Sequence, residues 1–209
     1  LGDPHARISF SEELKVCAED CIAEAAKNLN VVVEALLQCL LGMPHKTSKY
    51  ILLLALIRES NTELPEAVIT GLKVSLEGLG NEVPWWLPGQ VLRVVAEMAT
   101  VRLVDTKSLV ASINSLCNRL SSNSALIALY YGLPFGAKLL REENPEFLDG
   151  VLNGLSSQEV DMKLRFRIDD ADVSFDYKGA FQSLFGRDQT MLSPLVVINP
   201  VESVAPLCS

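Results

Sequence analysis

The apolar residues in the first three quarters of the chain recur at helical spacing. Residues 36–61 predict two apolar helices with a break at residues 42–44 (Gly-Met-Pro), because glycine permits a left-handed helix end and proline cannot continue the first helix. The second of these helices is apolar almost continuously from Tyr50 to Ile57. A helix that is apolar on all sides has to be buried on all sides, so we expect it at the centre of a larger helical stack.

Further helices are predicted on both sides of this buried helix. Ser11 is expected to cap a first helix that ends near Asn28, and Asn30 a second helix that ends near Leu41. Prolines at helix starts, glycines after helix ends and apolar residues at helical spacing indicate the remaining helices. They span approximately residues 65–79, 88–104, 106–120, 126–132, 134–141 and 145–155.

The predicted helices follow one another through short links of roughly two to eight residues, which makes sequential helices antiparallel neighbours. Pairs of helices that recur at a spacing of roughly 35 to 45 residues are typical of an α-solenoid. The predicted fold class is therefore all-α, with an α-solenoid of antiparallel, HEAT-like helix pairs over residues 1–156.

The pattern changes in the last quarter of the chain. Apolar and basic residues alternate from Met162 to Ile168, which is the period of a strand, and a second alternating run at residues 173–177 would complete a hairpin. Farther on, prolines interrupt every pattern, while residues 196–198 are too apolar for a free linker. We therefore expect residues 157–209 to form a C-terminal appendage, with a hairpin and an extended tail that needs a partner surface.

The size and charge of the chain restrict the classes of function that it can have. Its 209 residues are enough for one domain, or for one domain with an appendage, and a hydrophobic content of 49% argues against wholesale disorder. The longest apolar run, Ile51 to Ile57, is far shorter than the ~20 residues of a membrane span, so we expect no membrane contact. The formal net charge of -8 disfavours a direct nucleic-acid surface, because such surfaces are usually basic.

The sequence carries no recognisable catalytic or cofactor-binding motif. It lacks a phosphate-binding Gly-Lys-Ser/Thr loop and a dinucleotide-binding glycine motif, and His5 and His45 are its only histidines. Cys17 and Cys21 share a predicted helix face, but no further Cys or His lies nearby in sequence to complete a metal site. The cysteines are odd in number and lie mostly in apolar helical patterns, which favours reduced thiols in the cytosol or nucleus. We therefore expect no enzymatic activity, no cofactor and no metal.

Five residues outside the core pattern are candidates for binding a partner. Trp85 and Trp86 stand in a predicted loop, either as a partner-binding hot spot or as anchors that cover a helix end, and the sequence does not separate these two interpretations. Lys163, Arg165 and Arg167 form a basic edge that could contact phosphate. Three basic residues of this kind, followed by aspartates, more often form a solvent-exposed face that binds no partner.

Three segments carry a family resemblance. Residues 36–57 combine a leucine-rich helix, the Met-Pro-His-Lys break, a tyrosine one helical turn later and a second leucine-rich helix. Residues 92–120 form two adjacent amphipathic helices, and residues 133–136 are Leu-Pro-Phe-Gly, ahead of another amphipathic helix. In order and spacing, over residues 11–155, these segments resemble the first helical-repeat domain of the large subunit of the nuclear cap-binding complex. The middle domain of eukaryotic initiation factor 4G is of the same type.

The resemblance implies a scaffold rather than a cap-binding protein. In that family a small RNA-recognition-motif subunit holds the mRNA cap, and the large subunit supports it and is a platform for RNA-processing and export proteins. The expected partners are therefore proteins, including such a small subunit, with RNA bound only indirectly. The implied location is nuclear, with shuttling to the cytoplasm. Phe135 stands where the family has tryptophan, so Phe135 joins the candidate partner-binding residues.

A second interpretation does not involve the cap. Helical repeats present broad grooves for partner peptides, so the chain is alternatively a generic α-solenoid adaptor in translation initiation or mRNA decay. In either case the acidic composition suits basic partner segments better than bare RNA.

Overall fold

The computed structural model describes residues 9–80, 82–156, 158–170, 175–186 and 193–195. Within these residues the chain forms ten α-helices, one short 3-10 helix and no strand, which confirms the predicted all-α class. The elements are α1 (Phe10–Gly42), η1 (Pro44–Lys46), α2 (Thr47–Ile57), α3 (Glu63–Glu77), α4 (Leu87–Thr100), α5 (Thr106–Arg119), α6 (Ser122–Gly132), α7 (Pro134–Glu143), α8 (Pro145–Asn153), α9 (Gln158–Asp170) and α10 (Tyr177–Phe185).

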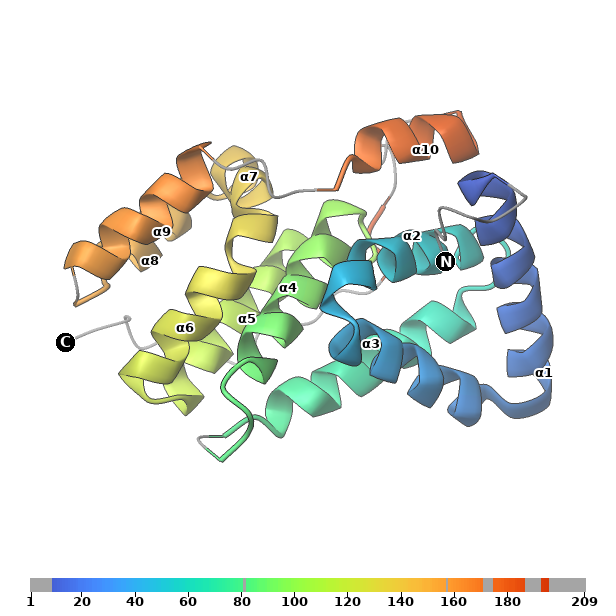
Figure 1. Cartoon of the computed structure of the whole chain (residues 1–209), viewed down its shortest axis with the longest axis horizontal. Helices are drawn as coiled ribbons and strands as arrows, with labels where there is room; N and C mark the ends of the chain where they lie inside the picture. Colours follow the sequence, from blue (N-terminus) through green and yellow to red (C-terminus); the bar gives the residue numbers. More distant parts are fainter. Residues whose placement is uncertain (1–8, 81, 157, 171–174, 187–192, 196–209) are drawn as a thin grey trace.

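Helix α4 lies at the centre of the molecule (Figure 1). It contacts α1, α2 and α3 on one side and α5, α6 and α7 on the other, and its contact with α6 is the most extensive of any helix pair. Helix α1 lies at one end of the molecule and α8 with α9 at the opposite end, whereas α10 lies on the side of α2 (Figure 1). In the described part of the chain, no helix is both long enough and apolar enough to cross a membrane.

The two predicted N-terminal helices form one element, α1, with a kink at Asn28. This residue has non-helical backbone angles (φ −152°, ψ 87°), and its Oδ1 accepts a hydrogen bond of 3.4 Å from a backbone N–H in the next turn. Asn28 therefore caps the second arm in place of the predicted Asn30. The first arm begins after Ser9 rather than Ser11: the Ser9 hydroxyl accepts from the N–H of Glu12, whose carboxylate accepts from the N–H of Ser9.

Helix α2 is the buried helix that the sequence predicts. Residues 51–55 and Ile57 are each at most 1% exposed. The turn between α1 and α2 is held by Gln90 of α4, whose buried Nε2 donates to the backbone oxygen of Leu40 (2.7 Å) and to Oγ1 of Thr47 (2.8 Å). A buried carbonyl at a helix end needs such a donor, so one side chain of α4 fixes this turn.

Helices α4 and α6 cross where both carry glycine. A Cβ at Gly89 would lie 2.8 Å from Cβ of Tyr131. A Cβ at Gly132 would lie 2.8 Å from the backbone oxygen of Gly89 and 2.7 Å from Cβ of Leu92. These distances are shorter than van der Waals contact, so only glycine lets the two backbones approach this closely.

The predicted strand and hairpin in the C-terminal quarter are wrong, because this segment is helical. Residues 158–170 form α9, and Tyr177–Phe185 form α10. Residues 173–174, where the second strand was expected to begin, lie outside the described residues, as do residues 196–198.

The alternation that predicted a strand reflects two stripes on helix α9. Leu164 is buried and Ile168 packs against the core, while Met162 and Phe166 are 64% and 67% exposed. Apolar residues at a spacing of four on two opposite faces give the same alternation as a strand over so short a run. Ion pairs at the same spacing, which stabilise a helix, join Lys163 to Glu159 (2.6 Å) and Arg165 to Asp161 (3.0 Å).

Helix α10 packs back on the centre of the molecule. Its residues Tyr177 and Phe181 are buried. The hydroxyl of Tyr177 donates to the buried carboxylate of Glu97 in α4, which also pairs with Arg93 (Nε to Oε1, 2.6 Å). A buried carboxylate has to be paired and hydrogen-bonded, so Tyr177 satisfies a group that α4 cannot satisfy alone.

The described residues after α10 also contact the helical body. Arg58, at the end of α2, donates to the backbone oxygen of Arg102 (2.9 Å) and to that of Ser193. Leu195 packs against the core. The described parts of residues 175–195 are therefore tied to the helices that precede them, through the core and through hydrogen bonds.

Replacement of Gly132 by alanine is expected to destabilise the protein. The new methyl group would press on the Gly89 backbone oxygen, and overpacking of this kind costs about 1–3 kcal/mol. The free energy of unfolding in urea measures the effect. Gly150→Ala is the matched control: a Cβ there meets nothing within 4 Å, so this exposed helical position should gain about 0.5–1 kcal/mol. Equal effects of the two substitutions would contradict the close approach of α4 and α6.

The substitution Tyr177→Phe is expected to cost about 1–3 kcal/mol at neutral pH, because it removes the hydroxyl donor of the buried Glu97 carboxylate. Burial, and then the nearby Glu97 charge, raise the pKa of Tyr177 well above its usual range. The folded protein holds this proton more tightly than the unfolded chain does. The contribution of the Tyr177 hydroxyl to the free energy of unfolding is therefore complete below about pH 10, and it is lost as the pH rises through the raised pKa.

Urea unfolding at about pH 8 and above about pH 10 tests this contribution. The variant should lose less stability between the two conditions than the native protein does. The pKa of Tyr50 is also raised, to about 12, by burial and by Cys39. The loss of stability that follows from ionisation of Tyr50 should be the same in both proteins. Identical pH dependence in the two proteins would contradict the assigned role of Tyr177.

Candidate partner-docking surface

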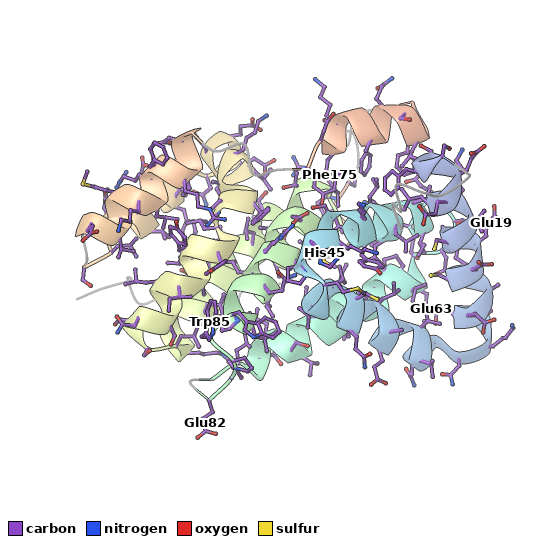
Figure 2. All side chains as sticks on the ribbon, in the orientation of Figure 1. Glu19, His45, Glu63, Glu82, Trp85 and Phe175 are labelled. Atoms are coloured by element: carbon purple, nitrogen blue, oxygen red, sulfur yellow. The ribbon has the colours of Figure 1, made fainter. Side chains whose placement is uncertain are left out.

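Aromatic side chains gather where the loop ahead of α4 meets the end of α6. Trp85 is 61% exposed, Trp86 41% and Tyr131 44%. The Trp85 and Tyr131 rings lie 5.8 Å apart between centroids, and Tyr130 meets Tyr131 edge-on at 6.0 Å. Figure 2 shows Trp85 at this loop, with Glu82 pointing outward from the same loop. Large exposed apolar side chains in one contiguous patch mark an interaction site.

The backbones of α4 and α6 set the positions of these rings. Trp86 directly precedes α4, and its backbone oxygen accepts from the N–H of Gln90 (3.0 Å). In the first turn of α4, Gly89 makes the close contact with Tyr131. Trp85 and Tyr131 are therefore attached to two helices that cannot separate without breaking the central packing, which keeps the rings together in the absence of a partner.

Helix α9 adds a cationic edge to the aromatic rings. The guanidinium carbon of Arg167 lies 4.8 Å from the ring centroid of Tyr130 and 6.0 Å from that of Tyr131. One turn earlier, the pKa of Lys163 is raised, first by its hydrogen bond to Glu159 and in smaller part by Tyr130. The Trp85–Arg167 surface is defined as Trp85, Tyr130, Tyr131 and Arg167.

Two predicted partner-binding residues have their contacts inside the chain instead. Phe135 is half-buried against the core, and the guanidinium of Arg93 lies over its ring at 4.1 Å. Arg165 binds Asp161 (3.0 Å) and also donates to Asn153 of α8, on the other side of α9 from Lys163. The structure thus brings Trp85 together with the Arg167 edge of α9 and leaves Phe135 and Arg165 elsewhere.

Tyr130 and Tyr131 did not stand out in the sequence. They lie in an apolar helix, and tyrosine fits the core of such a helix as well as its surface. The adjacent Gly132 was a signal for a helix end, and two neighbouring aromatic residues at such an end were the only clue. Their exposure depends on which face α6 presents to α4, which sequence alone does not determine.

Three cysteines cluster between the two arms of α1 near Tyr50. Burial raises the pKa of Cys17 and of Cys21, and the neighbouring Cys17 and Cys39 act in the same direction on Cys21. Raised thiol pKa values disfavour the thiolate, which is the form that reacts and binds metals, so Cys17 and Cys21 act as small packed hydrophobes. Among the described residues, no group of three or more His, Cys, Asp or Glu side chains is arranged to hold a metal ion.

Comparison with models of known protein families, with curated proteins and with solved structures gives no significant match to this chain. The likeness to the large subunit of the cap-binding complex therefore remains a prediction from the sequence. The function proposed below is argued from the surface itself.

Proposed function

We propose that this chain is a non-enzymatic helical scaffold that docks a protein partner on the Trp85–Arg167 surface. The observation that supports the proposal is the group of exposed aromatic rings that two closely crossing helices hold in place. Tryptophan, tyrosine and arginine are the residue types that most often dominate the binding energy of protein interfaces.

The rigidity of this surface favours a docking role. Each side chain that is ordered on binding costs about 0.5–1.5 kcal/mol, and rings that already contact each other in the free protein avoid part of that cost. Trp85 is 61% exposed, which favours the hot-spot interpretation over the anchor interpretation. A protein partner could bury its own apolar side chain against these rings.

A nucleic-acid partner fits this surface less well. Binding to RNA or DNA draws much of its strength from several phosphate contacts. The basic edge offers fewer free cations than the sequence suggested, since Arg165 is bound to Asp161 and Lys163 to Glu159. The net charge of -8 also repels a negatively charged nucleic acid at long range.

The assignment to the cap-binding complex is a more specific form of this proposal, and it rests on the resemblance of residues 11–155 alone. A scaffold of that kind would carry a small RNA-recognition-motif subunit and export or processing proteins, in the nucleus. The alternative remains a helical adaptor in translation initiation or mRNA decay. Both forms require a docking surface for proteins.

Partner retention tests the docking role directly. A tagged chain with Trp85→Ala and Tyr131→Ala is expected to retain at least about tenfold less of the partners that the native chain retains, since one hot-spot residue contributes about 2 kcal/mol or more. Both residues are substantially exposed, so stability should change by less than about 1 kcal/mol. The matched control is Val31→Ala, a 60% exposed residue on α1, which contributes no residue to this surface. Retention that is equal in all three proteins would exclude this surface as the docking site.

Elution with a cap analogue separates the two forms of the proposal. If the chain belongs to a cap-binding assembly, mass spectrometry of the retained proteins should include a small RNA-recognition-motif subunit. A cap-analogue resin should then hold both proteins and release them together when free cap analogue is added. Partners that are retained without any cap dependence would support the adaptor form and exclude the cap-binding form.

A further inference from the structure

We infer that the Trp85–Arg167 surface takes an acidic protein segment, whose carboxylate binds Arg167 while a neighbouring apolar side chain packs on Trp85 and Tyr131. This inference rests on the proposed docking role and adds the chemical class of the partner. It differs from the expectation that the acidic composition of the chain favours basic partners.

Arg167 stands apart from the other arginines in the described part of the chain. Each of the others donates to a carboxylate or to a backbone oxygen: Arg58, Arg93, Arg102, Arg119, Arg141 and Arg165. The contacts of Arg167 within the described residues are with the ring faces of Tyr130 and Tyr131. Among the described residues, the other arginines each have an oxygen acceptor and the guanidinium of Arg167 has none.

The position of Arg167 prepares it for an anion. A guanidinium that lies over an aromatic ring keeps its N–H groups in its own plane, where a carboxylate can accept two of them side by side. Arg167 is half-buried, and the Tyr130 ring covers part of it. Both features lower the local polarity and strengthen a charge-assisted hydrogen bond relative to one in open water.

Charge and shape on this surface agree with an acidic protein segment. Lys163 lies one turn before Arg167 and contributes a second positive charge, although Glu159 partly compensates it. A single arginine that has no oxygen acceptor among the described residues suits one carboxylate, whereas nucleic acids depend on a row of cations. The rings of Trp85 and Tyr131 beside it supply the apolar contact that gives most interfaces their strength.

Titration of the full chain with matched synthetic peptides tests the inference. The acidic probe carries glutamates on both sides of a Leu-Phe pair; in the basic probe each glutamate is lysine, and in the neutral probe each is glutamine. A short oligouridylate is the fourth probe. Binding is followed by NMR through the indole N–H of Trp85, because the chain has only two tryptophans and Trp85→Ala assigns the signal.

The acidic probe is expected to shift the Trp85 signal and to bind at least about tenfold more tightly than the other three, with an affinity that falls as salt is added. The substitution Arg167→Gln should weaken its binding about tenfold or more. Arg165→Gln removes the same charge from the other side of α9 and should change the affinity less than about twofold. Arg167→Lys keeps the charge without the paired N–H groups and should lie between the native protein and Arg167→Gln.

Three results would overturn the inference: tighter binding of the basic probe or of the oligouridylate, an unchanged affinity in Arg167→Gln, or an equal loss in Arg165→Gln. Thermal unfolding of each variant shows whether the substitution leaves the fold intact. If Arg167→Gln unfolds early, Arg167→Lys and the salt dependence of the native protein carry the test. Loss of partner retention in the Trp85→Ala, Tyr131→Ala chain, without any response to the acidic probe, would sustain the docking role and reject an acidic partner.

Discussion

The close approach of α4 and α6 at Gly89 and Gly132 is the contact on which most of this structure depends. The two helices are so close that a Cβ at either glycine would lie within 3 Å of atoms of the other helix. The same contact directs Trp85 and Tyr131 toward each other at the surface. Packing in the core and the shape of the candidate docking surface are therefore consequences of one steric constraint.

Polar side chains of α4 connect this centre to the rest of the chain. Gln90 binds the turn between α1 and α2, and Glu97 binds Tyr177 of α10. Each of these groups is buried, so each partner satisfies a hydrogen-bonding need that apolar packing would leave open. One helix thereby joins the N-terminal helices, the C-terminal helix and the aromatic surface into a single body.

The candidate docking surface joins residues from three distant parts of the sequence. Trp85 comes from a loop, Tyr131 from the end of α6 and Arg167 from α9. The aromatic rings hold the Arg167 guanidinium without supplying an oxygen acceptor, which leaves a positive group and apolar faces side by side. That combination is the physical basis for both the docking proposal and the acidic partner.

Local sequence was sufficient for most of the helices. The prolines at residues 134 and 145 mark the starts of α7 and α8 as the structure has them, because the fixed backbone angle of proline acts within one turn. It was insufficient at the kink in α1, where the sequence predicted Asn30 as the cap and the structure has Asn28. It was also insufficient for α9, since alternation over seven residues fits a strand or two helical stripes equally well.

The sequence by itself determined the all-α class and the burial of α2, and it named Trp85 and Arg167 among the candidate partner-binding residues. These follow from residue type and spacing, which act along the chain. Only the tertiary structure decided that Tyr130 and Tyr131 complete the surface and that Arg165 faces away from it. Those outcomes depend on which faces of α4, α6 and α9 meet, and that is set by the side chains that fit between helices far apart in sequence.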